Sequence, residues 1–447
     1  MLKLFLWLRY LHKKKIVFLS IAAVAVSVSL LIVVASLFTG FIHAFEQAAV
    51  EAVGDVVINP PVVISQYDEL IESLEEQESI TAATAMVWGY GLLHLDEGNV
   101  RAVQILGMEP EKRSKVTDFK KYLLSQKNPS ITASVNIEDS PESIQGYVGI
   151  GLLTEPDEQT DEYDAEKALK KLGEKVTLTT GAVSSSGQGE TRDDFKRQII
   201  RFTITDVVET GNYQFDHESI YLPLEQLSKT MYPDEPLPVA QQIQIKLTDG
   251  VDPEVAIAII RGVWINFVDE YYNSNQYMIS QTEILTSIEM QSDWIAAYQQ
   301  QMSVLLVIFG VVSFGVVLLI FCIFSLIVRL KEKDIAVIKS CGMASTSVAM
   351  VFVGFGACVG VVGSGLGVIL GYVITKNINT IEEWIRIVFG MKLWKSSVYF
   401  FTKIPNEVDW ESALRVVLFA IAAAAVGAII PAIVAARKKP VEILRYE

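Results

Sequence analysis

Cysteine and positive charge are scarce in this chain of 447 residues. Its 3 cysteines all lie outside residues 43–301, so that long segment must fold without a disulfide framework. Its 37 Lys and Arg residues are outnumbered by 52 Asp and Glu residues, which gives a formal net charge of -15. Nucleic-acid binding requires concentrated basic residues to neutralise phosphates, and this balance argues against it.

The common catalytic and nucleotide-binding motifs are also missing. The sequence has no G-x-x-x-x-G-K-[ST] phosphate loop, no H-E-x-x-H pair and no G-x-S-x-G elbow. Its 4 histidines are scattered and show no metal-ligand spacing. We therefore expect that this chain is not an enzyme and that it binds no metal and no cofactor.

Apolar residues, in contrast, are abundant and occur in long runs. They make up 51% of the chain, and the mean hydropathy is +0.35. A helix needs roughly 20 apolar residues to cross a hydrocarbon core of about 30 Å. Four transmembrane helices are predicted, at residues 16–42, 302–328, 343–375 and 416–436. The first is longer than the apolar region of a signal peptide, so we interpret it as a retained anchor.

Charges are segregated along the chain and indicate its orientation. Residues 43–301 carry 43 acidic and 18 basic side chains, a net charge of -25, and the remaining residues carry 9 and 19, a net charge of +10. Basic clusters precede the first span and follow the second and the fourth. Because such clusters stay in the cytoplasm, we expect both termini to be cytoplasmic and residues 43–301 and 376–415 to lie outside.

Residues 43–301 are predicted to form an α+β extracytoplasmic domain inserted between the first and second spans. Alternating or β-branched runs predict strands, and runs with helical periodicity interrupt them. We expect a helix over 281–301 that is continuous with the second span, and exposed loops at 154–164 and 181–194. The strands are expected at 55–59, 100–106, 175–180, 199–208, 219–222 and 242–247, and the helices at 67–76, 165–172, 224–231 and 253–272.

Glycines recur every four residues in the third span. This interval places small residues on one helix face and lets a neighbouring helix approach closely. We therefore expect helix packing along this face, although the spacing is also common by chance in glycine-rich spans. The glycines are Gly356, Gly360, Gly363, Gly367 and Gly371.

The short inside segment 329–342 joins the second and third spans. Ile335 and Ile338 are three residues apart, and Gly342 can end a helix and turn the chain. We expect a short amphipathic helix here that could dock into a groove on a cytoplasmic partner. The alternative is a plain loop whose charges only set the topology. A second interfacial helix is expected at residues 1–15, with a cytoplasmic tail at 437–447.

Several motifs give the chain a resemblance to the permeases of type VII ABC transporters, in particular the lipoprotein-releasing LolC/LolE family. These motifs are LRYLHKKK, QILGMEP, EKDIAVIKSCG, GSGLGVILG, VYFFTKIPNEVDW and the final PVEILRYE. The order of one span, a large outside domain and three further spans is also similar. The resemblance implies a MacB-like periplasmic domain and an FtsX-like permease domain over 302–447.

The resemblance further implies partners and site residues. A LolD-like cytoplasmic ATPase would carry ATP and Mg, and a second permease copy or sister subunit would complete the complex in a bacterial inner membrane. The cargo would be a lipoprotein, passed to a LolA-like periplasmic carrier. The candidate contacts to the ATPase are Glu332, Lys333, Asp334, Ile335, Ile338 and Gly342, and possible acyl-chain contacts are Phe38, Phe41 and Phe45.

Two departures keep other functions open. Residues 181–200 fall where the family's carrier-binding hook would lie, but they contain Ser and Gly and no proline. The first span ends in a loose match, VVASLFTGF, to the family pattern. The alternatives are a MacB-like efflux or mechanotransmission module and an FtsX-like regulator of a cell-wall hydrolase. The sequence does not distinguish a homodimer from a heterodimer, or a LolC-like from a LolE-like role.

Overall fold

The structure of the chain is a computed structural model. It describes residues 15–95, 98–127, 144–157, 160–182, 196–330, 332–340, 342–390, 392–395 and 403–437. The expected interfacial helix at 1–15, except Lys15, and the expected tail beyond 437 lie outside the described residues, as does most of the expected loop at 181–194. The chain divides into two compact units, of which one comprises Met1–Ala44, Trp294–Trp384 and Ile404–Glu447, and the other Phe45–Asp293 and Ile385–Lys403.

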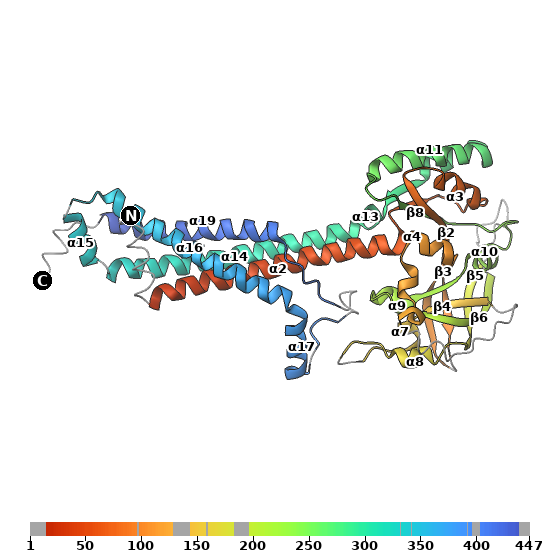
Figure 1. Ribbon diagram of the computed structural model, residues 1–447, viewed down its shortest axis with the longest axis horizontal. Helices are drawn as coiled ribbons and strands as arrows, with labels where there is room; N and C mark the ends of the chain where they lie inside the picture. Colours follow the sequence, from red (N-terminus) through yellow and green to blue (C-terminus); the bar gives the residue numbers. More distant parts are fainter. Residues whose placement is uncertain are drawn as a thin grey trace. The chain divides into compact units, whose positions relative to one another are not determined.

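The first unit, here called the helical unit, is built from long apolar helices (Figure 1). Among the described residues, three helices are long and apolar enough to cross a membrane, at Phe18–Val53, Ser345–Lys376 and Trp410–Val434. The expected span 302–328 lies within a fourth continuous helix whose side chains are only partly described, so the number of four spans stays a prediction. The helices are α2 (Lys15–Val53), α14 (Ser292–Leu330), α15 (Glu332–Ser340), α16 (Ser345–Lys376), α17 (Ile378–Phe389) and α19 (Trp410–Arg437).

The second unit, here called the sheet unit, contains one mixed sheet in the order β3-β7-β4-β6-β5-β2-β8-β1-β9, with a further β3–β2 pairing. Pairing therefore runs from β2 through β5, β6, β4, β7 and β3 back to β2, and these strands close on themselves. Closure leaves no exposed edge in this part of the sheet. The strands are β1 (Val56–Asn59), β2 (Ile80–His94), β3 (Val100–Met108), β4 (Ile144–Gly149), β5 (Lys175–Ala182), β6 (Lys196–Val208), β7 (Ser219–Pro223), β8 (Gln242–Leu247) and β9 (Glu283–Thr286).

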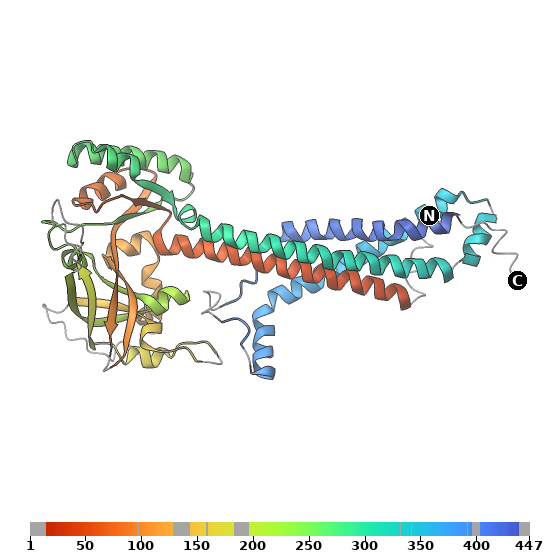
Figure 2. The same cartoon turned by 180° about the vertical axis from the view of Figure 1, so that it is seen from behind.

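Short helices connect the strands and cover the sheet, as both views show (Figures 1 and 2). The closed strands enclose a core that includes Phe202, Leu178 and Ile105. A second core forms where α3 and α11 cover β1, β8 and the first half of β2, with Trp264 and Leu70 at its centre. The helices are α3 (Tyr67–Glu75), α4 (Pro110–Val116), η1 (Phe119–Tyr122), α5 (Leu124–Lys127), α7 (Ile150–Leu153), α8 (Ala165–Leu169), α9 (Tyr213–Glu218), α10 (Leu224–Met231), α11 (Pro253–Tyr271), α12 (Gln276–Gln281) and α13 (Ser287–Met290).

The expected helix over 281–301 is wrong in its first part. Glu283–Thr286 forms strand β9, which pairs antiparallel with β1, and Ser287–Met290 forms the short helix α13. Thr286 caps that helix, because its side chain accepts from the backbone N–H of Glu289 while the Glu289 side chain accepts from the N–H of Thr286. The long helix begins only at Ser292. The apolar residues at 284, 285 and 288 fit a helical period, but pairing with β1 decides their structure.

Candidate functional site

Helix α15 is the short helix between α14 and α16, where sequence analysis expects a helix and a turn. It ends at Ser340, and Gly342 follows in the left-handed region with φ of 92°. The backbone N–H of Gly342 donates to the carbonyl oxygen of Lys339 at 3.0 Å. A residue with a Cβ is strained at this φ, so glycine suits the turn that leads into α16.

Ile335 attaches α15 to the neighbouring helices. Its side chain is 5% exposed and forms a small cluster with Val328 of α14 and Val348 of α16. Its role as an ATPase contact stays a prediction, and in this structure its apolar surface is covered by its own chain. The side chains of Glu332, Lys333, Asp334 and Ile338 lie outside the described residues. Val337, which sequence analysis does not name, is 52% exposed.

Lys339 provides a second attachment for α15. Its Nζ donates to the carbonyl oxygen of Ala436 at 2.8 Å, in the last turn of α19. The last carbonyls of a helix lack partners within the helix, and a cation there also complements the helix dipole. Helix α15 is therefore held against the ends of α14, α16 and α19.

Two of the glycines in α16 lie against α19. A Cβ added to Gly356 would lie 2.6 Å from the Cβ of Ala428, and one added to Gly360 would lie 3.0 Å from the Cβ of Ala424. Both alanines are completely buried. Small residues thus face each other at intervals of four on both helices, and this brings their backbones close together.

The other three glycines lie against α2. A Cβ added to Gly363 would lie 2.7 Å from the Cβ of Val24, and Gly367 and Gly371 meet Val28 and Ile32 in the same way. Helix α16 thus uses one end of its glycine stretch for α19 and the other end for α2. A change in the position of α16 would therefore alter its contacts with both α19 and α2, because closely packed helices transmit strain to their neighbours.

Two segments about 370 residues apart in sequence meet near the end of the expected first span. The hydroxyl of Thr39 donates to Oδ2 of Asp409 at 3.0 Å, across a sequence separation of 370. Gly40 lies against Pro405, where an added Cβ would be 2.9 Å from the Cβ of the proline. Asp409 also caps α19, because its Oδ1 accepts from the backbone N–H of Ser412 at 3.0 Å. The VVASLFTGF and KIPNEVDW motifs are therefore in contact.

The three phenylalanines named as possible acyl-chain contacts lie along α2. Phe41 is 8% exposed, whereas Phe38 and Phe45 are half-buried. Phe41 is therefore covered by protein in this structure. Contact of these side chains with acyl chains stays a prediction.

The end of α2 is fixed in the sheet unit by a tight turn. Gly54 follows the helix with φ of 84°, and a Cβ there would lie 2.8 Å from the carbonyl oxygen of Ile245. The next residue, Asp55, donates its backbone N–H to that same oxygen at 2.8 Å. Strand β1 then begins at Val56 and pairs with both β8 and β9. Because β9 leads through α13 into α14, the two long helices connect to neighbouring strands of one sheet.

Arg113 of α4 joins this helix end to the sheet. Its guanidinium is buried and donates to the Ala52 carbonyl oxygen near the end of α2 and to Oε1 of Gln244 on β8, and it also contacts Met86 Sδ at 3.1 Å. Burial lowers the pKa of Arg113 to about 10, and the group still carries its charge at neutral pH. Tyr122 adds a further contact, with its hydroxyl donating to the Glu51 carboxylate.

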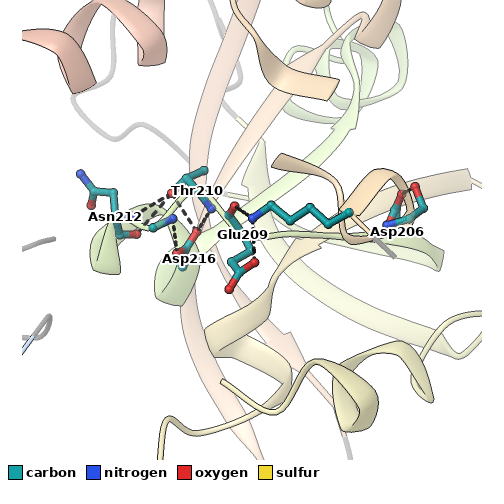
Figure 3. A network of polar contacts seen from close by, with 8 residues as sticks. Asp206, Glu209, Thr210, Asn212 and Asp216 are labelled. Carbon is teal, nitrogen blue, oxygen red and sulfur yellow. Dashed lines mark hydrogen bonds and ion pairs between the residues drawn. The ribbon is translucent and has the colours of Figure 1, made fainter. Parts of the chain in front are cut away.

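A polar network at the end of β6 organises the chain around α9 (Figure 3). Asp216 accepts from the backbone N–H and hydroxyl of Thr210, at 2.6 and 2.8 Å, and from the N–H of Gly211 at 2.9 Å. Burial raises the pKa of Asp216 to about 7, and these hydrogen bonds oppose the rise. Nearby, Lys127 Nζ forms an ion pair with Glu209 at 2.7 Å.

These carboxylates accept hydrogen bonds that shape the neighbouring loops. The two Asp206 oxygens are occupied by Ser125 and by the N–H of Val207. Within the described ranges, no group of three or more His, Cys, Asp or Glu side chains is placed to hold a metal ion. Two further features of the described residues are the attachment of α15 to three helix ends and the connection of two long helices to one sheet.

Comparison with known proteins relates this arrangement to permeases. The FtsX-like permease C-terminal family matches residues 306–440, which include α15, α16 and α19. The lipoprotein-releasing system transmembrane protein LolC of Neisseria meningitidis serogroup B is 25% identical over 470 aligned residues, covering 100% of this chain and 99% of that protein. The chain is thus similar to LolC along its whole length. This similarity and the long apolar helices support an integral membrane protein of the ABC permease type.

A LolE protein is also similar to this chain along most of its length. The LolE protein of Haemophilus influenzae is 23% identical, covering 95% of this chain and 93% of that protein. Among solved structures, the periplasmic region of MacB from Actinobacillus actinomycetemcomitans is similar at 12% identity and a TM-score of 0.30, covering 55% of this chain and 94% of that one. A score this low supports no argument, so the comparison with permeases depends on the sequence relatives.

Proposed function

We propose that this chain is the noncatalytic permease subunit of an ATP-driven transporter that releases lipoproteins from the outer leaflet of the inner membrane. The observation that carries the proposal is the similarity to LolC along the whole chain. The family match over 306–440 supports it, because that region contains the short inside helix and its attachments. In this proposal a separate LolD-like subunit binds ATP and Mg and hydrolyses the ATP.

The contacts around α15 suggest how such a subunit would be driven. An ATPase that binds the exposed side of α15, where Val337 lies, would move a helix that is attached through Ile335 and Lys339 to α14, α16 and α19. Helix α16 would carry this movement to α2 through its glycine contacts. Because α2 and α14 are each one continuous helix of 39 residues, they would transmit it to the sheet that they enter.

The same proposal includes a membrane topology and a set of partners. Both termini and α15 lie in the cytoplasm, in agreement with the basic residues near the expected span ends. Residues 43–301 lie outside and receive the lipoprotein, which is then handed to a LolA-like carrier. A second permease copy or a sister subunit completes the membrane part. Phe38, Phe41 and Phe45 of α2 remain candidates for acyl-chain contact.

Two measurements test the proposal. Purification of the chain from its native membrane in a mild detergent is expected to recover a P-loop ATPase in a fixed ratio, and recovery of the chain alone would contradict the transporter class. Depletion of the chain is expected to leave lipoproteins in the inner membrane. If the ATPase is recovered but lipoproteins are sorted normally, a MacB-like efflux module or an FtsX-like regulator explains the complex better.

A further inference from the structure

Helix α17 exposes several large apolar side chains, although Ile378, Ile381 and Ile385 on its apolar side are half-buried. The exposed fraction is 67% for Trp384, 71% for Ile387 and 64% for Val388, whereas Glu382 and Arg386 are half-buried. All 12 residues of α17 are described, and none of them is buried. A helix on a water-soluble surface has the opposite arrangement, with its apolar stripe toward the core.

The distribution of side chains around α17 is strongly two-sided. At 3.6 residues per turn, one side carries all seven apolar residues from Ile378 to Phe389, with Thr380 as the one polar residue among them. The opposite side carries Asn379, Glu382, Glu383 and Arg386. A sharp polar face and a broad apolar face are the properties of helices that lie in the plane of a membrane surface. The outside segment 376–415, which we expect from the sequence to be a loop, therefore contains a helix.

Neighbouring residues place the start of α17 at the boundary between lipid and water. Tyr372 of α16 stacks on Trp410 of α19 with ring centroids 5.9 Å apart, and the Lys376 ammonium lies 5.7 Å from the centre of the Tyr372 ring. Aromatic rings and lysines concentrate at the headgroup level of membrane proteins. Helix α17 begins two residues after Lys376, where the chain turns at Asn377 (Figure 1).

Asn379 holds the first turn of α17 at this level. Its Nδ2 donates to the carbonyl oxygen of Ile404 at 3.0 Å, and its Oδ1 accepts from the N–H of the same residue at 3.0 Å. Ile404 belongs to the segment that leads into α19. The start of α17 is thus tied to both helices that flank it, and a helix of this length extends only about 18 Å from that point.

We propose that α17 lies in the outer headgroup region of the bilayer, with Trp384, Ile387 and Val388 in contact with the acyl chains. The occupant of the exposed face is lipid, because α17 continues directly from a helix that crosses the membrane and starts at its aromatic boundary. A face of this kind would otherwise expose several large apolar side chains to water. The proposal is independent of the ATPase and of the cargo.

The test uses the full chain in nanodiscs of phosphatidylethanolamine and phosphatidylglycerol. Nitroxide labels are attached at Val388→Cys or, as the matched control on the other side of the helix, at Glu383→Cys, with Cys322, Cys341 and Cys358 replaced by Ser. The label at 388 is expected to collide several-fold more often with oxygen than with an aqueous nickel complex, and the label at 383 is expected to show the reverse.

Two outcomes would contradict this placement. Ready access of nickel to both labels would place α17 in water. Exclusion of both reagents at 388 would show a protein cover, for example a second copy, and either result would overturn the proposal.

A second measurement avoids the cysteine replacements. The tryptophan fluorescence of the unmodified chain is compared with that of Trp384→Phe in nanodiscs that contain lipids brominated near the headgroup. The difference between the two signals is expected to be quenched by bromine and only weakly by aqueous acrylamide. Strong acrylamide quenching without bromine quenching would contradict the placement of α17 even if the labelled variants fail to fold.

Discussion

Gly367 of α16 and Val28 of α2 are so close that an added Cβ at position 367 would lie 2.7 Å from the Cβ of the valine and 2.8 Å from the carbonyl oxygen of Ala25. The variant Gly367→Ala must therefore displace backbone or side chains, at a cost of about 1–3 kcal/mol for overpacking. We expect a clear fall in the thermal unfolding temperature of the purified chain. Gly365→Ala is the control, because no heavy atom lies within 4 Å of a Cβ added there. An equal effect of both changes would show that helix propensity, and not packing, is measured.

Replacement of Arg113 is expected to destabilise the chain strongly. Arg113→Met leaves the buried Gln244 amide oxygen and the partly buried Ala52 carbonyl oxygen without this donor, and loss of a buried partner costs about 1–3 kcal/mol. Lys115→Met, an exposed position of the same helix α4, is the matched control. Chemical unfolding of the full chain measures both. If Arg113→Met is as stable as Lys115→Met, the guanidinium does not hold the end of α2.

Much of the sheet unit could be predicted from local sequence pattern. Strands such as β5 and β8 alternate between apolar and polar residues because one face is buried, and the expected bounds are nearly those of the structure. Strand β2 was not predicted, although it is the longest. Residues 82–87 are buried on both faces, which removes the alternation, and Gly89 and Gly91 interrupt the rest.

The candidate site was predictable only in its local parts. The positions of α15 and of the turn at Gly342 follow from a short range of the sequence. The contact between Thr39 and Asp409 joins residues 370 positions apart, and no local pattern encodes such a pairing. Likewise, Ile335 and Val337 are both apolar and two residues apart, and only the packing of α14 and α16 decides that the first is covered and the second exposed.

The different environments of Ile335 and Val337 give a prediction about the partner ATPase. Val337→Glu places a charge on an exposed position, so we expect unchanged thermal stability but a large loss of ATPase co-purification. Ile335→Glu places a charge in a buried apolar cluster, and we expect it to lower the stability of the chain itself. Both quantities are measured on the same detergent extracts. Full retention of the ATPase by Val337→Glu would exclude this side of α15 as the contact surface.

The buried Asp216 should make the stability of the chain depend on pH. Its pKa is raised from 3.8 to about 7, so between these values the folded chain binds more protons than the unfolded chain, and stability falls as pH rises. This group contributes at most about 4 kcal/mol over that range.

The variant Asp216→Asn lacks the titrating carboxyl group and tests this prediction. The free energy of unfolding of the variant is compared with that of the original chain at each pH. From about pH 4 to pH 7 we expect the original chain to lose stability relative to the variant. Thr160→Val, at a half-buried hydroxyl that donates to Asp157 outside the network, should keep the pH dependence of the original chain. A difference that is constant across this range would mean that Asp216 stays ionised in the folded state, held so by Thr210 and Gly211.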